Sequence, residues 1–175
     1  MADNGYESGS ETIGPIFNQV KAFFDEDGWP YEQLEDQAIL RLEYEGENGK
    51  WRCYAHVIEE RQRFVFLSSL ANYVPKLMKL EASEYLTRAN FGMEVGNFEM
   101  DFSDGTVRYR TSVDVEGGEL TSIMIKNLVY VNIAVMDQYL PGLGKVVKDG
   151  LEPEKAIEEV EEEDSGESEE SEENG

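Results

Sequence analysis

Residues 40–57 read LRLEYEGENGKWRCYAHV and contain two runs in which apolar residues occupy every second position. The first run places Leu40, Leu42 and Tyr44 on one side, and the second does the same with Trp51, Cys53, Ala55 and Val57. Such a period of two is typical of strands that bury one face. The glycines at 46 and 49 can adopt positive φ between the runs, so the stretch predicts a β-hairpin.

Three further strands are predicted from the same kind of pattern. An apolar run at 64–67 indicates a central strand. A second hairpin is expected from residues 98–102 and 107–115, which flank the Asp104-Gly105 turn. Hairpin connections favour antiparallel pairing. We therefore predict a five-stranded antiparallel sheet.

Helices are predicted before, between and after these strands. The first begins at Gly14-Pro15 and ends near Gly28, the second covers 76–90, and the longest covers 120–139. Pro141 and Gly142 are expected to break the last helix, with a shorter helix over 143–149. The fold class is α+β, in the order α-βββ-α-ββ-α, with the sheet flanked by helices on one face. Three parts are expected: a disordered tail at 1–13, a domain at 14–150, and an acidic, mostly disordered tail at 151–175.

The net charge of −23 limits the partners that the protein can bind. An acidic surface repels nucleic-acid phosphates and anionic lipid headgroups, so we expect no nucleic-acid partner and no membrane insertion. The single cysteine, Cys53, excludes an internal disulfide, and the polar N-terminus does not resemble a signal peptide, which favours a cytoplasmic protein. Residues 152–175 hold 13 acidic residues against one lysine. This segment either keeps the protein soluble or acts as an intramolecular mask or a docking segment for a basic partner.

Residues suited to catalysis or metal binding are sparse. His56 is the only histidine, and its strand position beside Arg52 and Tyr54 predicts a structural, partly exposed side chain. Cys53 alternates with apolar residues and is expected to be a small core residue. The acidic turns at Gly28 and Gly105 lack the oxygen ligands that a calcium loop needs. We predict no enzymatic activity, no catalytic residues, no metal and no cofactor.

The segment 85–101, YLTRANFGMEVGNFEMD, joins the second helix to the fourth strand and resembles the YbjN domain family of bacterial sensory transduction regulators. Supporting matches are DGWP at 27–30, GENGKWRC at 46–53, VRYRTSVD at 107–114 and MDQYLP at 136–141. The similarity extends from about Pro15 to Val147 and is greatest to cyanobacterial members. It implies a fold like that of type III secretion chaperones, no enzymatic activity, no cofactor, and a role in stress response or signalling.

Binding to another protein is therefore the expected function, with a small-ligand sensor that has a pocket between sheet and helices as the alternative. Trp29 and Tyr31 lie in a proline-containing loop and are either an aromatic anchor for a partner or a flap that closes the core. Asn90 and Asn97 lie at element ends, where they can contact a partner, although helix capping also explains Asn90.

The 120–139 helix is apolar around most of its circumference, more than covering one face of a sheet requires. Either the shorter helix expected at 143–149 covers the excess, or a second protein chain does. The resemblance to secretion chaperones, which bind proteins and often dimerise, implies a second chain, so we expect a protein partner and a homodimer. The residues expected to face outward are Ile123, Tyr130 and Val131.

Overall fold

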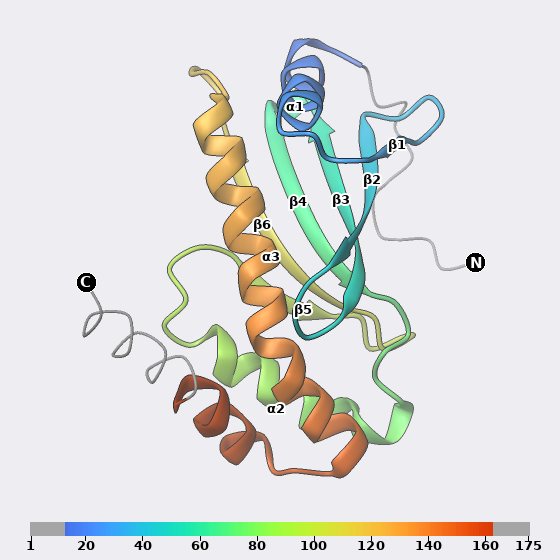
Figure 1. Cartoon of the computed structure of the whole chain (residues 1–175), viewed down its shortest axis with the longest axis vertical. Helices are drawn as coiled ribbons and strands as arrows, with labels where there is room; N and C mark the ends of the chain where they lie inside the picture. The colour runs from blue at the N-terminus through green and yellow to red at the C-terminus, as the bar shows by residue number, and fades with distance from the viewer. Residues whose placement is uncertain (1–12, 163–175) are drawn as a thin grey trace.

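A six-stranded antiparallel sheet forms the centre of the computed structural model, which describes residues 13–162 (Figure 1). In spatial order the strands are β1 (Glu32–Gln33), β2 (Ile39–Glu45), β3 (Lys50–Ile58), β4 (Arg63–Leu70), β6 (Val107–Asp114) and β5 (Asn97–Met100). The tails expected to be disordered lie outside the described residues, apart from Ile13 and residues 151–162.

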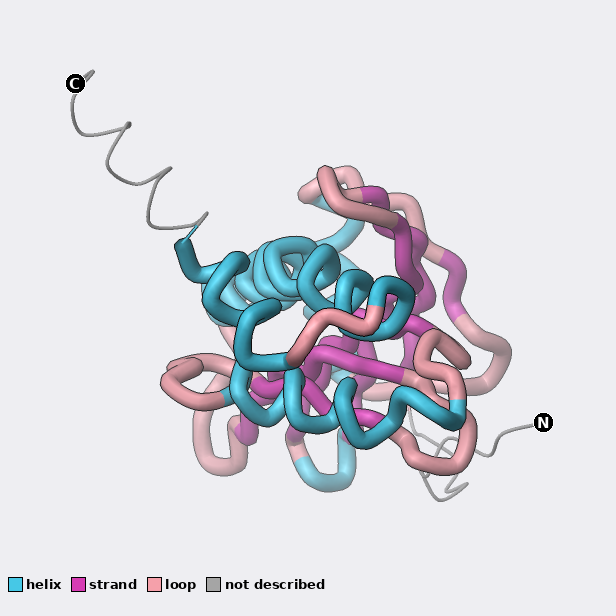
Figure 2. Tube along the Cα trace, turned by 90° about the horizontal axis from the view of Figure 1, so that it is seen from below, coloured by secondary structure: helices cyan, strands magenta, loops and turns pink. Residues whose placement is uncertain are grey.

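Three long helices accompany the sheet: α1 (Pro15–Glu26), α2 (Lys79–Asn90) and α3 (Ser122–Gly144). Helix α3 runs across β4 and β6, α1 packs on β3 and on α3, and α2 lies at the β5 end (Figures 1 and 2). Short 3-10 turns follow β3 at Glu59–Arg61 and precede α2 at Lys76–Met78. The predicted α+β class, with an antiparallel sheet flanked by helices, is confirmed.

Alternation along the strands decides which face of the sheet the helices cover. On the helix side the core includes the residues predicted from the first hairpin, together with Phe64, Phe66, Val107 and Tyr109. Phe66 stacks on Phe24 of α1 with ring centroids 6.2 Å apart. The other face of each strand carries the intervening residues, which include most of the chain's arginines. The two faces therefore differ in chemistry as the period of two requires.

The predicted number of five strands is wrong, because the two-residue strand β1 adds a sixth. Glu32 pairs with Arg41 and Gln33 with Leu40 at the edge of the sheet. Neither residue of β1 is apolar, so the strand has no alternation that a pattern could detect. Main-chain pairing and the ion pair between Arg41 and Glu32 hold it in place.

The predicted break at Pro141 and Gly142 is also wrong, because α3 continues to Gly144. Proline lacks the N–H that would reach the carbonyl oxygen of residue 137. That oxygen, on Asp137, instead accepts a hydrogen bond from Asn48 Nδ2 at 3.2 Å. The separate helix expected at 143–149 is replaced by one π-helical turn, Lys145–Asp149, which directly continues α3.

Residues 153–162 form a further helix beyond the expected domain boundary at 150. Its apolar side chains Ala156, Ile157 and Val160 are buried. Ion pairs join Glu154 to Arg88 of α2 at 3.3 Å and Glu159 to Lys145 at 2.6 Å. This helix therefore belongs to the helical side of the molecule. Within residues 13–162, no helix has both the length and the apolar character needed to cross a membrane.

Candidate functional site

The structure brings Trp29 and Tyr130 together, although they are far apart in sequence. Their rings meet edge to face with centroids 6.0 Å apart. The carboxylate of Asp27 accepts hydrogen bonds from both, at 3.0 Å from Trp29 Nε1 and 2.8 Å from the Tyr130 hydroxyl. These bonds lower the pKa of Asp27, that from Trp29 most, and the bond to Asp27 raises the pKa of Tyr130. Tyr130 thus fastens the loop after α1 to α3.

Tyr31 is fastened in a similar way. Its hydroxyl donates to Asp25 Oδ1 at 2.5 Å, and its ring packs against Phe24. Burial, followed by the hydrogen bond to Asp25, raises the pKa of Tyr31 to about 12. Trp29 also stacks on Tyr44 of β2 at 5.7 Å. Both loop aromatics are partly buried against the core, as a flap would be.

The other two residues expected to face outward on α3 differ in exposure. Ile123 is 67% exposed in the first turn of the helix, whereas Val131 is half-buried. Exposed neighbours on α3 include Lys126, Asn127 and Ala134, so the outer face of this helix is mixed rather than apolar. The excess apolar surface predicted for the 120–139 helix is covered in part within the chain, where Tyr130 meets Trp29.

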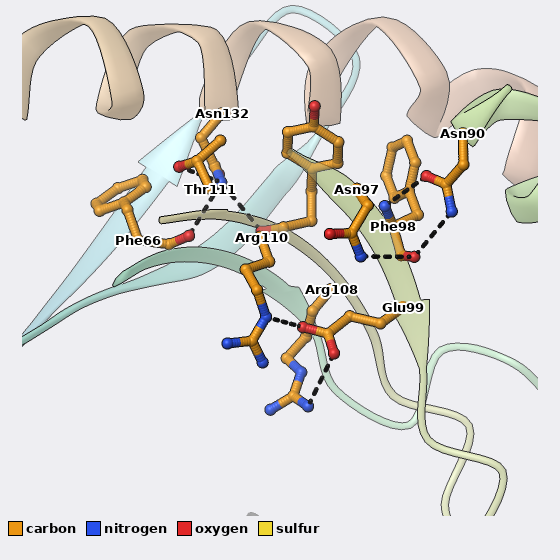
Figure 3. Close-up of polar contacts among 10 residues, drawn as sticks. Phe66, Asn90, Asn97, Phe98, Glu99, Arg108, Arg110, Thr111 and Asn132 are labelled. Atoms are coloured by element: carbon orange, nitrogen blue, oxygen red, sulfur yellow. Dashed lines mark hydrogen bonds and ion pairs between the residues drawn. The ribbon is translucent and has the colours of Figure 1, made fainter. Parts of the chain in front are cut away.

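Asn90, the last residue of α2, lies near Asn97, the first residue of β5 (Figure 3). The Asn90 side chain forms two hydrogen bonds with the main chain of Phe98: Nδ2 donates to the Phe98 oxygen at 3.0 Å, and Oδ1 accepts from the Phe98 nitrogen at 2.7 Å. Asn97 is exposed, and its Nδ2 is 3.3 Å from the same oxygen. Asn90 therefore holds the edge strand, whereas Asn97 presents its side chain to the surface.

The face of the sheet opposite the helices, here called the open face, was missed by the sequence analysis as a candidate site. Five of the chain's seven arginines lie on it: Arg41, Arg52, Arg63, Arg108 and Arg110. Arg108 and Arg110 both point at Glu99 of β5, at 3.9 Å and 2.5 Å (Figure 3). The alternation of arginine along the strands is visible in the sequence, but which of these arginines are neighbours on the open face depends on strand order, which the sequence pattern does not contain.

Apolar side chains on the open face are buried. Val65 is 4% and Leu67 is 5% exposed, yet neither belongs to the hydrophobic core on the helix side. His56 lies beside Val65 in the register and is 3% exposed, so the predicted partial exposure of this histidine is wrong.

A second surface feature surrounds the start of α2. Leu77 and Leu80 are 89% and 74% exposed, and Phe102 of the β5–β6 loop is also exposed. Leu80 and Phe102 line a hollow of about 680 Å³ together with Val74 and Pro75. Lys79 Nζ donates to the carbonyl oxygens of Phe102 at 2.7 Å and Ser103 at 3.3 Å, which holds the loop against the helix. We call this feature the α2 apolar surface.

The structure also bears on catalytic and ligand-binding alternatives. Cys53 is buried, and burial raises the pKa of its thiol to about 12. Among residues 13–162, no three His, Cys, Asp or Glu side chains are grouped as a metal site needs. Large buried side chains, including Phe24, Phe66 and Tyr109, pack between sheet and helices, where the alternative function of a small-ligand sensor would need a pocket. A hollow of about 560 Å³ lies instead at the end of the first hairpin, lined by Tyr44, Trp51 and Tyr73 among others.

These features define a class of protein: an α+β domain whose antiparallel sheet is covered by helices on one face. Residues 17–145 match the family model YbjN, described as "Putative bacterial sensory transduction regulator". The chain belongs to the YbjN family.

Solved structures with a similar fold include YbjN from E. coli, which is 13% identical at a TM-score of 0.55. That alignment covers 70% of this chain and 86% of the other. The chain is also similar to the type III secretion chaperone SycH of Yersinia pestis in complex with a fragment of YscM2, at 11% identity and a TM-score of 0.47, covering 69% of this chain and 95% of the other. The ExsC–ExsE complex gives 14% identity, a TM-score of 0.46, and coverage of 68% and 86%. No curated protein matches this chain.

Proposed function

We propose that this protein is a non-enzymatic, cytoplasmic, protein-binding regulatory module that acts in signalling or stress response. The observation that carries the proposal is the α2 apolar surface. Leucine side chains exposed to 89% and 74% beside an exposed phenylalanine form an apolar surface that a partner can bury. Membership of a family described as sensory transduction regulators supports the regulatory part of the proposal.

The lysines beside this surface indicate the chemistry of the partner. Lys76 and Lys79 border the hollow that Leu80 and Phe102 line. One carboxylate, that of Asp104, also lines the hollow. In a chain with a net charge of −23, a site with two lysines and one aspartate is locally less repulsive to an acidic segment. The partner segment is expected to place an apolar side chain in the hollow and a carboxylate near Lys76. Such a contact combines an apolar anchor with a polar rim.

Affinity capture from native lysate tests the proposal, with the full chain as bait and mass spectrometry as the readout. The test bait carries Leu80→Glu with Phe102→Ser, and the control bait carries Thr87→Glu, an exposed position farther along α2. A partner recovered with the wild type and the control, but lost with the test bait, is the expected result. Recovery of the same proteins by all three baits would exclude this surface as the binding site.

Self-association is a separate part of the proposal. We propose a homodimer in which Ile123 of α3 contacts the second copy, because it is the most exposed large apolar side chain on that helix. A symmetric dimer uses the same surface on both copies, so Ile123 would be buried in each of them.

A further inference from the structure

The helix over residues 153–162 packs onto the family domain from outside the range that defines it. The family model matches residues 17–145 and ends before this helix begins. Gly150 adopts a left-handed φ of 70° and ends the π-helical turn after α3, and Pro153 starts the new helix. The chain thereby returns to the side of α2 (Figure 1). The helix is therefore an addition that folds back onto the domain.

The surface under this helix is formed by α2 and by the end of α3. The helix buries Ala156, Ile157 and Val160. Val160 packs over Gly142 of α3, where an added Cβ would lie 2.9 Å from Val160 Cγ2 and would also collide with the Tyr85 hydroxyl. The absence of a side chain at residue 142 thus lets the two helices approach closely.

Two ion pairs orient the helix on this surface. Glu154 pairs with Arg88 of α2 at 3.3 Å. Glu159 pairs with Lys145 of the π-helical turn at 2.6 Å. The two acids are about 1.4 helical turns apart, so they project from opposite sides of the buried apolar stripe. Arg88 also pairs with Glu84 of its own helix at 2.9 Å. We call Arg88, Gly142 and Lys145 the helix-binding surface, which fits an amphipathic helix with an acid on each side of its apolar stripe.

Several features make this helix easier to detach than the rest of the fold. It is short, and isolated helices of its length are marginal in water. Apart from its three buried side chains, its residues are exposed or half-buried. Both ion pairs are partly exposed, and exposed ion pairs contribute little to stability. Segments with few buried contacts open locally while the remaining structure stays folded. Opening of this helix would uncover an apolar surface that a second helix can bury.

We propose that the helix-binding surface is a docking site for an acidic amphipathic helix of a partner protein, and that residues 153–162 are a displaceable occupant that keeps the site closed. The incoming helix buries apolar side chains over Gly142 and pairs its acids with Arg88 and Lys145, which is recognition of a helix by a groove. The two bases offset the acidic charge of the chain at this place. The proposal does not depend on the α2 apolar surface, which surrounds the start of α2.

The test supplies the helix as a separate peptide of residues 151–162. The receptor is the isotope-labelled full chain with Ile157→Glu and Val160→Glu, which releases its own helix, and two-dimensional NMR detects binding. The peptide is expected to shift the amide signals of the helix-binding surface. Wild-type protein should bind it about tenfold more weakly or less, because the tethered helix competes. Glu154→Lys with Glu159→Lys is a second releasing variant that leaves the buried side chains unchanged, and dispersed spectra show that both variants are folded.

Charge reversal shows whether the peptide uses this surface. Lys145→Glu in the first released variant should weaken binding about threefold or more, and a peptide with Glu159→Lys should restore it. The matched control is Lys126→Glu, at an exposed position near the other end of α3, which should change nothing.

Equal binding of the peptide by wild type and released variant would overturn the proposal. The same conclusion would follow if the peptide left the signals of a folded released variant unshifted. It would also follow if the wild-type signals of residues 153–162 changed with protein concentration, because a second copy would then be the occupant.

Discussion

Asn90 pairs with Phe98 through two hydrogen bonds, one donated to the Phe98 carbonyl and one accepted from the Phe98 N–H. A carboxamide offers a donor and an acceptor side by side, as a main-chain amide does. The last residue of α2 therefore stands where a further strand would pair with β5. Because β5 is four residues long and lies at the edge, this pairing protects main-chain groups that would otherwise be open to other chains.

Replacing Asn90 with alanine removes both bonds and leaves the main chain of Phe98 without them. We expect the free energy of unfolding to fall by about 1–3 kcal/mol. The matched control is Asn97→Ala at an exposed neighbouring site, which should cost about 0.5 kcal/mol or less. Urea denaturation of the two variants checks the prediction. If both substitutions lowered the free energy of unfolding equally, the two hydrogen bonds between Asn90 and Phe98 would not be a specific source of stability.

Asp137 joins α3 to the first hairpin. Its carboxylate accepts hydrogen bonds from the main-chain nitrogens of Glu47 at 2.8 Å and Asn48 at 2.9 Å. Successive N–H groups of a turn form a cradle for an anion. Asp137→Ala should lower the free energy of unfolding by about 1–2 kcal/mol, as the loss of a helix cap does. The control is Gln138→Ala, at the adjacent position. A similar fall in the free energy of unfolding for this control would argue that the main-chain cradle around Asp137 does not stabilise the fold. Thermal unfolding provides the measurement.

Tyr109 should make the free energy of unfolding fall as the pH becomes alkaline. Burial raises its pKa to about 12, and its hydroxyl donates to the Val95 carbonyl. The unfolded chain loses this proton near pH 10, before the folded chain does. The contribution of Tyr109 is thus complete below about pH 10 and declines as the pH rises toward about 12. Denaturation at a series of pH values should show the stability gap between wild type and Tyr109→Phe narrowing over this range. If the stability difference between wild type and Tyr109→Phe increased with pH, the raised pKa of Tyr109 would be contradicted.

The proposed homodimer makes a prediction for Ile123. Ile123→Glu places a charge in the contact, so it should shift the wild-type dimer to a monomer in analytical ultracentrifugation. Thr87→Glu, at an exposed position on α2, adds the same charge away from α3 and should leave the dimer intact. A wild type that sediments as a monomer at every concentration would rule out the dimer.

The sheet was predictable wherever local alternation is strong. The runs beginning at Leu40 and Trp51 match β2 and β3, and the Val107 run matches β6. The class of fold follows from these hairpins and the helical periods between them. The two-residue strand β1 was not predictable, since it depends on a partner strand rather than on its own composition.

Errors in the helices have a tertiary cause. Pro141 is a helix breaker in isolation, but Asn48 supplies the donor that the proline lacks, from a turn 93 positions earlier in the chain. Likewise, no local pattern could show which arginines of β2, β3, β4 and β6 are neighbours, because that depends on strand order. The positions of Trp29 and Tyr31 in a loop were evident from sequence, whereas their contacts with Tyr44 and Asp25 depend on the folded arrangement.

One polar residue lies between helix and sheet and limits how the two layers can fit together. Asn132 of α3 is fully buried, and its Nδ2 donates to the carbonyl oxygens of Phe66 on β4 and Tyr109 on β6, at 3.1 Å and 3.0 Å (Figure 3). Apolar contacts tolerate sliding and rotation, since one aliphatic surface can replace another. Hydrogen bonds to two carbonyl oxygens on different strands do not tolerate such sliding. Moving the helix by one residue would leave these buried polar groups without partners. Leucine at this position would fill the space yet permit several helix settings, so Asn132 selects a single arrangement of the two layers.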